Sequence, residues 1–265
     1  MNPTPYFSLL AARFRTLFQY RAAALAGVGT QVFWGIIRSM IFDAFYRSSS
    51  APQPMTREQT ITYIWLGQAM LLLAMCSTEG EVTAMIRSGA VAYELTRPVD
   101  LYWLWYARCF SGRAAPLLMR AIPILIISGL FFGLQAPASP TAALLFVISI
   151  FNGLLLAASI VTLVTISLLW TISGQGISSL APALIFFFSG IVIPLPLFPN
   201  WMQPIIKALP FRGLIDTPFR IYLGHFSSTE AASAMLQQAG WIIAFILIGR
   251  FVLSRGARRL IVQGG

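Results

Sequence analysis

The side chains that could carry out chemistry are few in this sequence and widely spaced. Among 265 residues there are eight carboxylates and a single histidine, His225. The carboxylates are Asp43, Glu58, Glu79, Glu81, Glu94, Asp100, Asp216 and Glu230. The sequence contains no P-loop, GxSxG or HExxH pattern and no spacing typical of metal ligands. We therefore expect a protein that is not an enzyme and holds no cofactor or metal ion of its own.

One segment gathers several charged residues, and it runs from residue 91 to 113 as VAYELTRPVDLYWLWYARCFSGR. Its Glu94, Arg97 and Asp100 could form charged contacts with a soluble partner. Pro98 predicts a bend in the chain, because proline disfavours helical conformation in the residue before it. Four aromatic residues typical of the headgroup level of a membrane follow: Tyr102, Trp103, Trp105 and Tyr106. Two interpretations of this segment stay open. It transmits a movement of a bound partner to the adjacent helices, or it is an interfacial loop stabilised by its own salt bridges.

The elements around this segment are predicted to lie in a lipid bilayer. Hydrophobic residues make up 57% of the chain, charged residues only 10%, and the mean hydropathy is +0.76. A soluble domain carries roughly 25% charged residues. Residues 121–206 contain no Asp, Glu, Lys, Arg or His at all. A run of this length without charge is typical of membrane-embedded helices.

The formal net charge is +10, and the basic residues stand beside the apolar runs. This placement favours contact with membrane lipid over binding of nucleic acid. The two cysteines, Cys76 and Cys109, cannot form a disulfide framework. We expect both to be reduced packing residues.

The apolar pattern predicts an all-α fold with six transmembrane helices in one domain, residues 1–265. The spans are expected at residues 22–45, 61–85, 114–132, 142–170, 177–193 and 239–253, the last beginning near residue 231. Residues 5–20 predict an amphipathic helix in the membrane interface. Residues 87–113 form the cytoplasmic segment, and residues 194–238 form an external segment with two short helices, 201–209 and 213–223. Arg38, near the outer end of the first span, is expected to extend toward Asp43 and Arg47.

The distribution of arginine predicts that both termini lie in the cytoplasm. Five basic residues flank the outer ends of the spans: Arg47, Arg57, Lys207, Arg212 and Arg220. Twelve flank the inner ends: Arg13, Arg15, Arg21, Arg87, Arg97, Arg108, Arg113, Arg120, Arg250, Arg255, Arg258 and Arg259. No acidic residue falls at the middle of a span, although ion-driven carriers usually place ionisable groups there. The energy for any transport is therefore expected to come from another subunit.

Two stretches carry a resemblance to a known family. The sequence VAYELTRPVDLYW after the second span resembles the corresponding loop of type-2 ABC exporter permeases. The external stretch LPFRGLIDTPFRIYLG, residues 209–224, is similar to one in an uncharacterised branch of these permeases. The resemblance extends over essentially the whole chain through the number of spans and the placement of loops.

The resemblance implies a role for each stretch. Residues 87–100 would match the coupling helix that binds the ATPase, with Arg87, Glu94, Leu95, Thr96, Arg97, Pro98 and Asp100 as candidate contacts. Gly174 and Gln175, in the turn 173–176, would form a second contact with the ATPase. Residues 201–209 and 213–223 would match re-entrant outer helices. There Arg212, Asp216 and Arg220 are candidates for the outer gate; Asp216 and Arg220 are four residues apart and could pair on one helix face. The second and fifth spans would line the path, with Leu71, Met75, Phe187 and Ile191 as candidate lining residues.

The function implied is that of a permease subunit of an ATP-driven exporter in the bacterial inner membrane. ATP and Mg would be bound by a separate cytoplasmic ABC ATPase, and a second permease subunit would complete a homodimer or a heterodimer. Two other hypotheses stay open at this point: a membrane scaffold of an envelope assembly that transports nothing, and an ion-coupled secondary transporter. The sequence does not identify the transported molecule.

Overall fold

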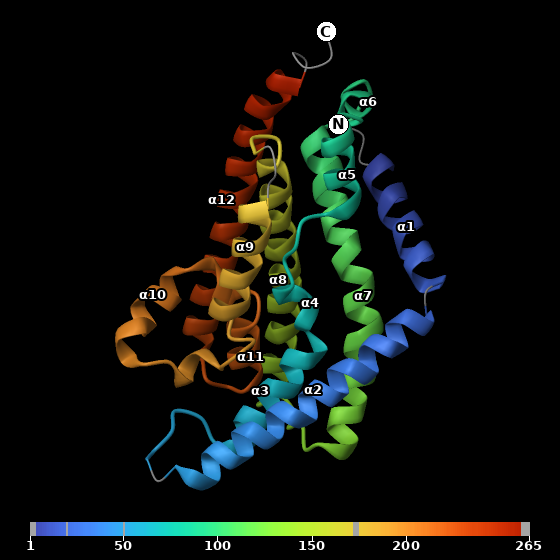
Figure 1. Ribbon diagram of the computed structural model, residues 1–265. Coiled ribbons are helices and arrows are strands. Elements are labelled where there is room, and N and C mark those ends of the chain that lie inside the picture. Colours follow the sequence, from blue (N-terminus) through green and yellow to red (C-terminus); the bar gives the residue numbers. More distant parts are fainter. Residues whose placement is uncertain (1–3, 20, 50, 172–174, 261–265) are drawn as a thin grey trace.

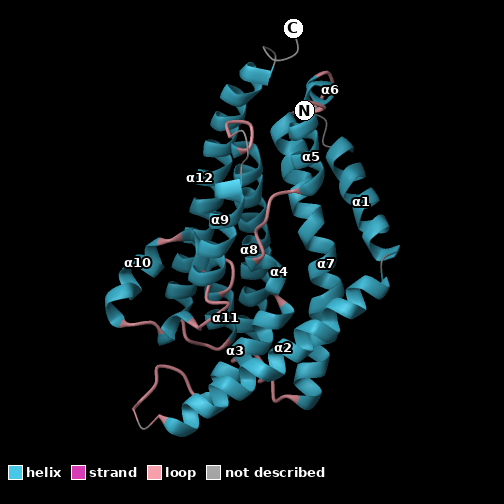
Figure 2. Cartoon of the chain, in the orientation of Figure 1, coloured by secondary structure: helices cyan, strands magenta, loops and turns pink. Residues whose placement is uncertain are grey.

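The computed structural model describes residues 4–19, 21–49, 51–171 and 175–260. Helices make up 80% of the structure, and the described residues contain no strand (Figure 2). The predicted all-α class is therefore confirmed. Four helices are long and apolar enough to cross a membrane, and they include residues 25–48, 101–131, 140–167 and 228–257. The prediction of six crossings remains a prediction, because the segments expected to form the second and fifth spans do not form helices of this length.

The N-terminal region consists of two helices, α1 (Thr4–Gln19) and α2 (Arg21–Ser48). Helix α1 lies against α7 (Leu101–Phe131) through Tyr6, Leu9 and Phe14, and α2 runs obliquely across α3 (Arg57–Ala69) and α7 (Figure 1). The separate helix predicted at the N-terminus is thus present. Its position in a membrane interface remains a prediction.

The predicted second span, residues 61–85, is wrong as a continuous helix. Helix α3 is followed by the single turn α4 (Leu71–Ala74), by an extended stretch, and then by α5 (Gly80–Ser88). The Arg113 guanidinium donates to the carbonyl oxygen of Ser77 at 3.0 Å, and the Thr165 hydroxyl accepts from the Glu79 amide at 3.1 Å. These two bonds satisfy the Ser77 carbonyl and the Glu79 amide, which have no partner within a helix.

Helix α7 begins at Leu101, whereas the third span is predicted to begin at residue 114, after the cytoplasmic segment 87–113. The carboxylate of Asp100 caps the helix by accepting from the backbone amide of Trp103 at 3.1 Å. At 1.5 Å per residue, the 31 residues of α7 extend about 46 Å, which exceeds a hydrocarbon core of about 30 Å. The aromatic run is therefore the first part of a long helix that extends beyond the core.

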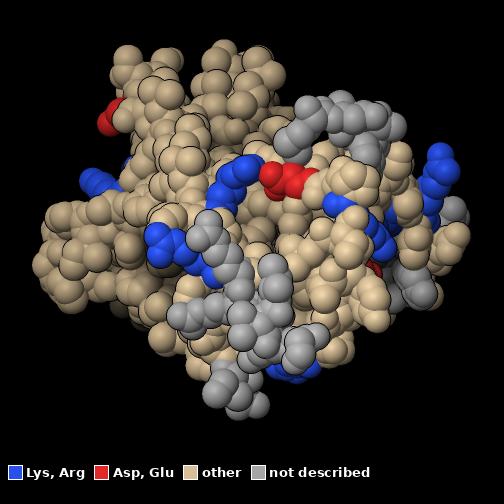
Figure 3. Space-filling view, turned by 90° about the horizontal axis from the view of Figure 1, so that it is seen from above, with Lys and Arg blue, Asp and Glu red and all other residues tan. Residues whose placement is uncertain are grey.

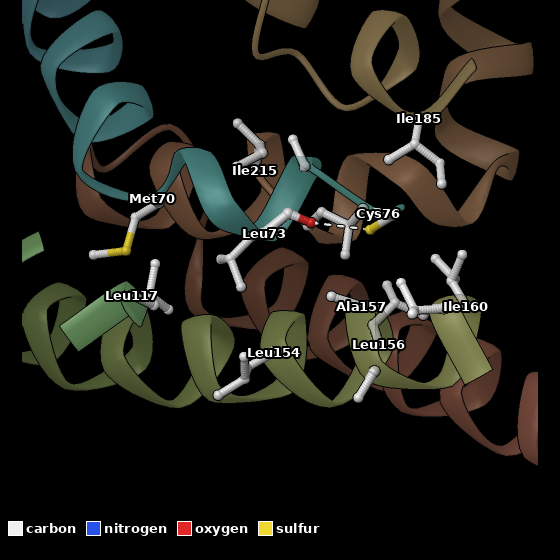
Figure 4. Close-up of a cluster of buried hydrophobic side chains, with 14 of the residues drawn as sticks. Met70, Leu73, Cys76, Leu117, Leu154, Leu156, Ala157, Ile160, Ile185 and Ile215 are labelled. Atoms are coloured by element: carbon white, nitrogen blue, oxygen red, sulfur yellow. Dashed lines mark hydrogen bonds between the residues drawn. The ribbon is translucent and has the colours of Figure 1, made fainter. Parts of the chain in front are cut away.

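Helix α8 (Pro140–Ser167) stands at the centre and packs against α7, α11 (Asp216–Tyr222) and α12 (Ser228–Leu260). Figure 4 shows the buried cluster where Leu73 and Cys76 meet Leu156 and Ala157 of α8. Cys76 and Cys109 are both buried free thiols. A Cβ atom built at Gly153 of α8 would lie 3.3 Å from the Gly213 carbonyl oxygen, so glycine permits this close approach of backbones.

The remaining helices form the predicted external segment and its approach. Helix α9 (Gln175–Phe188) has 14 residues, about 21 Å, which is short for a crossing. It is followed by the 3-10 turns η1 (Leu195–Leu197) and η2 (Asn200–Met202), α10 (Gln203–Ala208), the turn η3 (Pro210–Gly213) and α11. Short helices therefore occur in both predicted stretches, while their re-entrant path in a membrane remains a prediction.

The described part of the chain has two distinct ends. Helix α5, the short helix α6 (Val91–Leu95), the start of α7 and the C-terminal part of α12 gather at one end (Figure 1). Basic side chains are spread over this end when it is viewed from above (Figure 3). The loop between α2 and α3 and the turn between α7 and α8 lie at the opposite end.

Candidate functional site

The segment predicted to bind a partner, residues 87–100, is a compact projection between α5 and α7, which we call the handle. Helix α5 ends at Gly89, which adopts the left-handed conformation with φ 76° and donates to the Ile86 carbonyl. This turn directs α6 back toward α7. The Thr96 hydroxyl then donates to the Tyr93 carbonyl at 2.8 Å, which ends the short helix.

The exposed residues of the handle differ in part from those expected. Arg87, Leu95, Thr96, Arg97 and Pro98 are all exposed, as a contact surface requires. Tyr93 is the most exposed large hydrophobic residue of the described chain, with 78% of its surface accessible. Sequence reasoning missed Tyr93, although an aromatic residue beside a charged turn is a common anchor at protein interfaces.

Glu94 corrects the prediction that it contacts a soluble partner. It is only 3% exposed, and its carboxylate accepts two hydrogen bonds from Arg108 at 2.6 and 3.0 Å. The indole N–H of Trp105 donates to the same carboxylate at 2.8 Å. Arg108 is itself 8% exposed, so the pair is shielded from water on both sides. Glu94 therefore fixes α6 to α7 and is not available at the surface.

Asp100 connects the handle to two further helices. Besides capping α7, its carboxylate forms a salt bridge with Arg250 of α12 at 3.2 Å. Its backbone amide donates to the Tyr6 hydroxyl of α1 at 3.1 Å. Arg13 of α1 also forms salt bridges with Glu79, at 3.4 Å, and with Glu81. The handle is thus held by α1, α7 and α12 together.

Gly174 lies outside the described residues, and Gln175 is the first residue of α9. The second predicted contact with a partner is therefore a prediction still.

At the opposite end, Asp216 is buried where three elements meet. It is 2% exposed, and its carboxylate accepts from the Tyr63 hydroxyl of α3 at 3.2 Å. Its backbone amide donates to the carbonyl of Ser189, at the end of α9, at 3.2 Å. Gly190 has φ 94°, and a Cβ atom there would lie 2.4 Å from the Tyr63 hydroxyl oxygen. Only glycine fits this junction without strain.

The predicted Asp216–Arg220 ion pair is not among the salt bridges of the described residues. The Arg220 guanidinium instead lies over the Phe226 ring, 4.4 Å from its centroid. Arg212 donates to the side-chain oxygen of Gln237 in α12, at 3.1 Å from Nε. Each arginine therefore takes a partner from a segment that follows α11. Asp216 therefore joins α11 to α3 and to the end of α9, Arg212 joins η3 to α12, and Arg220 joins α11 to the loop that follows it.

A cavity of about 820 Å³ lies between α2, the junction of α3 with α4, and the end of α9. Leu71 and Ile191, two of the predicted lining residues, face it, whereas Met75 and Phe187 are not among its described lining residues. The expected contact of Arg38 with Asp43 is wrong. Arg38 lines this cavity and donates to the Val192 carbonyl at 2.7 Å, while Asp43 pairs with Arg47 and Arg57.

Comparison with known proteins identifies the family. Residues 32–264 match the family model described as ABC-2 family transporter protein. A search of curated proteins finds no match. The matched range includes the handle, the central helix α8, the residues around Asp216 and most of the cavity, whose lining residues Thr30 and Gln31 lie just before it. The chain therefore belongs to the ABC-2 transporter family, and it is a membrane-spanning permease subunit of an ABC transporter.

Proposed function

We propose that this chain couples ATP hydrolysis by a separate cytoplasmic ATPase to export of a substrate. The ATPase binds ATP and Mg, and a second permease subunit, identical or different, completes the transport path. The handle faces the cytoplasm, as do both termini, in the inner membrane of a bacterium. Membership of the ABC-2 family supports an ATPase partner.

The observation that carries the proposal is the construction of the handle. Exposed Tyr93, Leu95 and Arg97 offer an aromatic, an aliphatic and a cationic contact on one short projection. Beneath them, the buried Glu94–Arg108 pair and the Asp100–Arg250 pair fix the projection to α7 and α12. A force on the exposed residues is therefore delivered to long helices and is not absorbed by a flexible loop.

The charge of Arg97 provides the sharpest test of docking. The chain is co-expressed with an ABC ATPase of the same organism that co-purifies with it, and the complex is isolated through a tag on the chain. We expect Arg97→Glu to weaken the complex at least about tenfold, since reversing an exposed interface charge replaces an attraction by a repulsion. Stimulation of ATP hydrolysis by the chain should fall with it.

Arg47→Glu is the matched control, because Arg47 is 75% exposed at the opposite end of the molecule. This variant should bind the ATPase as the wild type does. Equal ATPase binding and stimulation by wild type and Arg97→Glu would refute docking through the handle. Transport by this chain alone under an ion gradient would refute the need for an ATPase.

A further inference from the structure

The cavity between α2, α3, α4 and α9 has the walls of a site for an apolar chain. Trp34, Ile41 and Phe45 of α2 and Phe186 of α9 line it, and each is more than a third exposed. Its volume of about 820 Å³ falls in the range of small-molecule sites, about 300–1,000 Å³. The apolar faces of α2 and α9 that flank it are exposed, so a ligand can enter from the bilayer.

One cation stands in this apolar surface. Arg38 is the sole charged side chain among the described residues that line the cavity. One of its terminal nitrogens donates to the Val192 carbonyl, which fixes the guanidinium at the cavity wall. The guanidinium has five N–H donors, and a neutral carbonyl does not balance its charge. A cation in an apolar site calls for an anionic partner.

Gln31 is a second polar side chain of the cavity, and one of its two polar atoms has no hydrogen-bond partner among the described residues. Gln31 is 3% exposed and donates from its side-chain nitrogen to the Gln68 carbonyl at 2.9 Å. Its side-chain oxygen is buried without a hydrogen-bond partner in the described part of the chain. Buried acceptors are normally satisfied, so turning the Gln31 amide until this oxygen reaches the cavity surface would gain a hydrogen bond from an O–H or N–H group of a ligand. Gln31 and Arg38 are seven residues apart on α2, which places them on one helix face.

We infer that this cavity binds a single-chain anionic amphiphile that enters from the membrane. Arg38 forms a salt bridge with the acidic group, and the Gln31 side-chain oxygen accepts a hydrogen bond from a hydroxyl or amide of the headgroup. The apolar chain packs against the aromatic walls. The inference rests on the proposed transport function insofar as this ligand is the transported molecule. Binding itself requires neither ATP nor the ATPase.

Lysophosphatidic acid with one oleoyl chain is a suitable probe, because it combines a phosphate, a free hydroxyl and one apolar chain. The purified chain in phosphatidylcholine nanodiscs is titrated with the tritiated probe, and uptake by empty nanodiscs is subtracted. Mono-oleoylglycerol, which lacks only the phosphate, is the neutral comparison. We expect saturable binding of the phosphate probe and binding at least about tenfold weaker for the neutral one, as loss of a charged hydrogen bond implies.

Arg38→Gln should weaken binding of the phosphate probe about tenfold or more and leave the neutral probe unchanged. Arg38→Lys should recover most of the affinity, and Arg47→Gln, on the same helix outside the cavity, should change nothing. Equal binding of the two probes, or wild-type affinity in Arg38→Gln, would overturn the inference.

A second pair of variants tests the cavity without touching its charge. Ile41→Trp fills it and should abolish saturable binding, whereas Met40→Trp, at a neighbouring position that is 66% exposed, should not. Unchanged binding in Ile41→Trp would overturn the site. The ATPase assay is separate: if probe binding holds while Arg97→Glu leaves ATPase coupling intact, the docking proposal fails and the site stands.

Discussion

The buried pair beneath the handle makes a quantitative prediction for Glu94→Gln. This change keeps the shape of the side chain but removes the charge that balances Arg108, which is 8% exposed. Breaking a buried pair by removing one partner costs about 3–5 kcal/mol. The opening of α6 should therefore become roughly two to three and a half orders of magnitude more frequent, at about 1.4 kcal/mol per tenfold change.

Hydrogen exchange of the backbone amides in residues 91–97 measures this opening directly. Glu81→Gln is the matched control, because Glu81 makes the same kind of pair with Arg13 but its side chain is 65% exposed. A surface pair contributes about 0.2–1 kcal/mol, so the control should change exchange by less than about tenfold. The double variant Glu94→Gln with Arg108→Met should regain part of the lost protection from exchange, since it leaves no buried charge without a partner. Exchange in Glu94→Gln within about threefold of wild type would refute the role of the Glu94–Arg108 pair in holding α6.

Three further substitutions test other parts of the fold. Gly190→Ala should lower the free energy of unfolding by about 1–3 kcal/mol, because φ is 94° and the new methyl group meets the Tyr63 hydroxyl; thermal unfolding checks this, and Gly29→Ala, inside α2 where a Cβ atom meets no other element within 4 Å, should not lower it. Arg113→Met should cost about 0.5–1.5 kcal/mol by removing the exposed hydrogen bond to the Ser77 carbonyl, and faster proteolysis at residues 75–79 than in the Arg57→Met control would show it. Tyr63→Phe should cost about 1–3 kcal/mol through loss of the donor to buried Asp216, and a melting temperature equal to wild type would contradict that role.

The sequence predicts the long helices well where apolar residues run without interruption. Helix α8 is an example: its uncharged run is bounded by Ser139, whose hydroxyl accepts from the Ala142 amide, and by Pro140 in the first turn. The pattern places the start of this helix at residue 114, because Arg108 and Arg113 interrupt the apolar run before it. Each of these arginines has a partner on another segment, which the local pattern does not contain.

The candidate sites also depend on partners from other segments, which the local sequence pattern does not contain. The charges and Pro98 single out residues 91–113, and the family resemblance implies residues 87–100, but neither predicts the direction of each side chain. Glu94 faces inward because Arg108 and Trp105 lie on the adjacent helix face, while Tyr93, one residue away, faces out. The spacing of Asp216 and Arg220 permits a pair, but Tyr63, Phe226 and tertiary packing decide their partners.

The claim that the handle receives the ATPase is tested most directly by photocrosslinking from its tip. Tyr93 is replaced by the photoreactive residue benzoylphenylalanine, and Ser48, exposed at the opposite end, is replaced in the same way as a control. The complex is isolated with its ATPase still bound and then irradiated. We predict that the ATPase is crosslinked from position 93 and not from position 48. An ATPase that co-purifies with both variants but is crosslinked only from position 48, or from neither, would contradict the account.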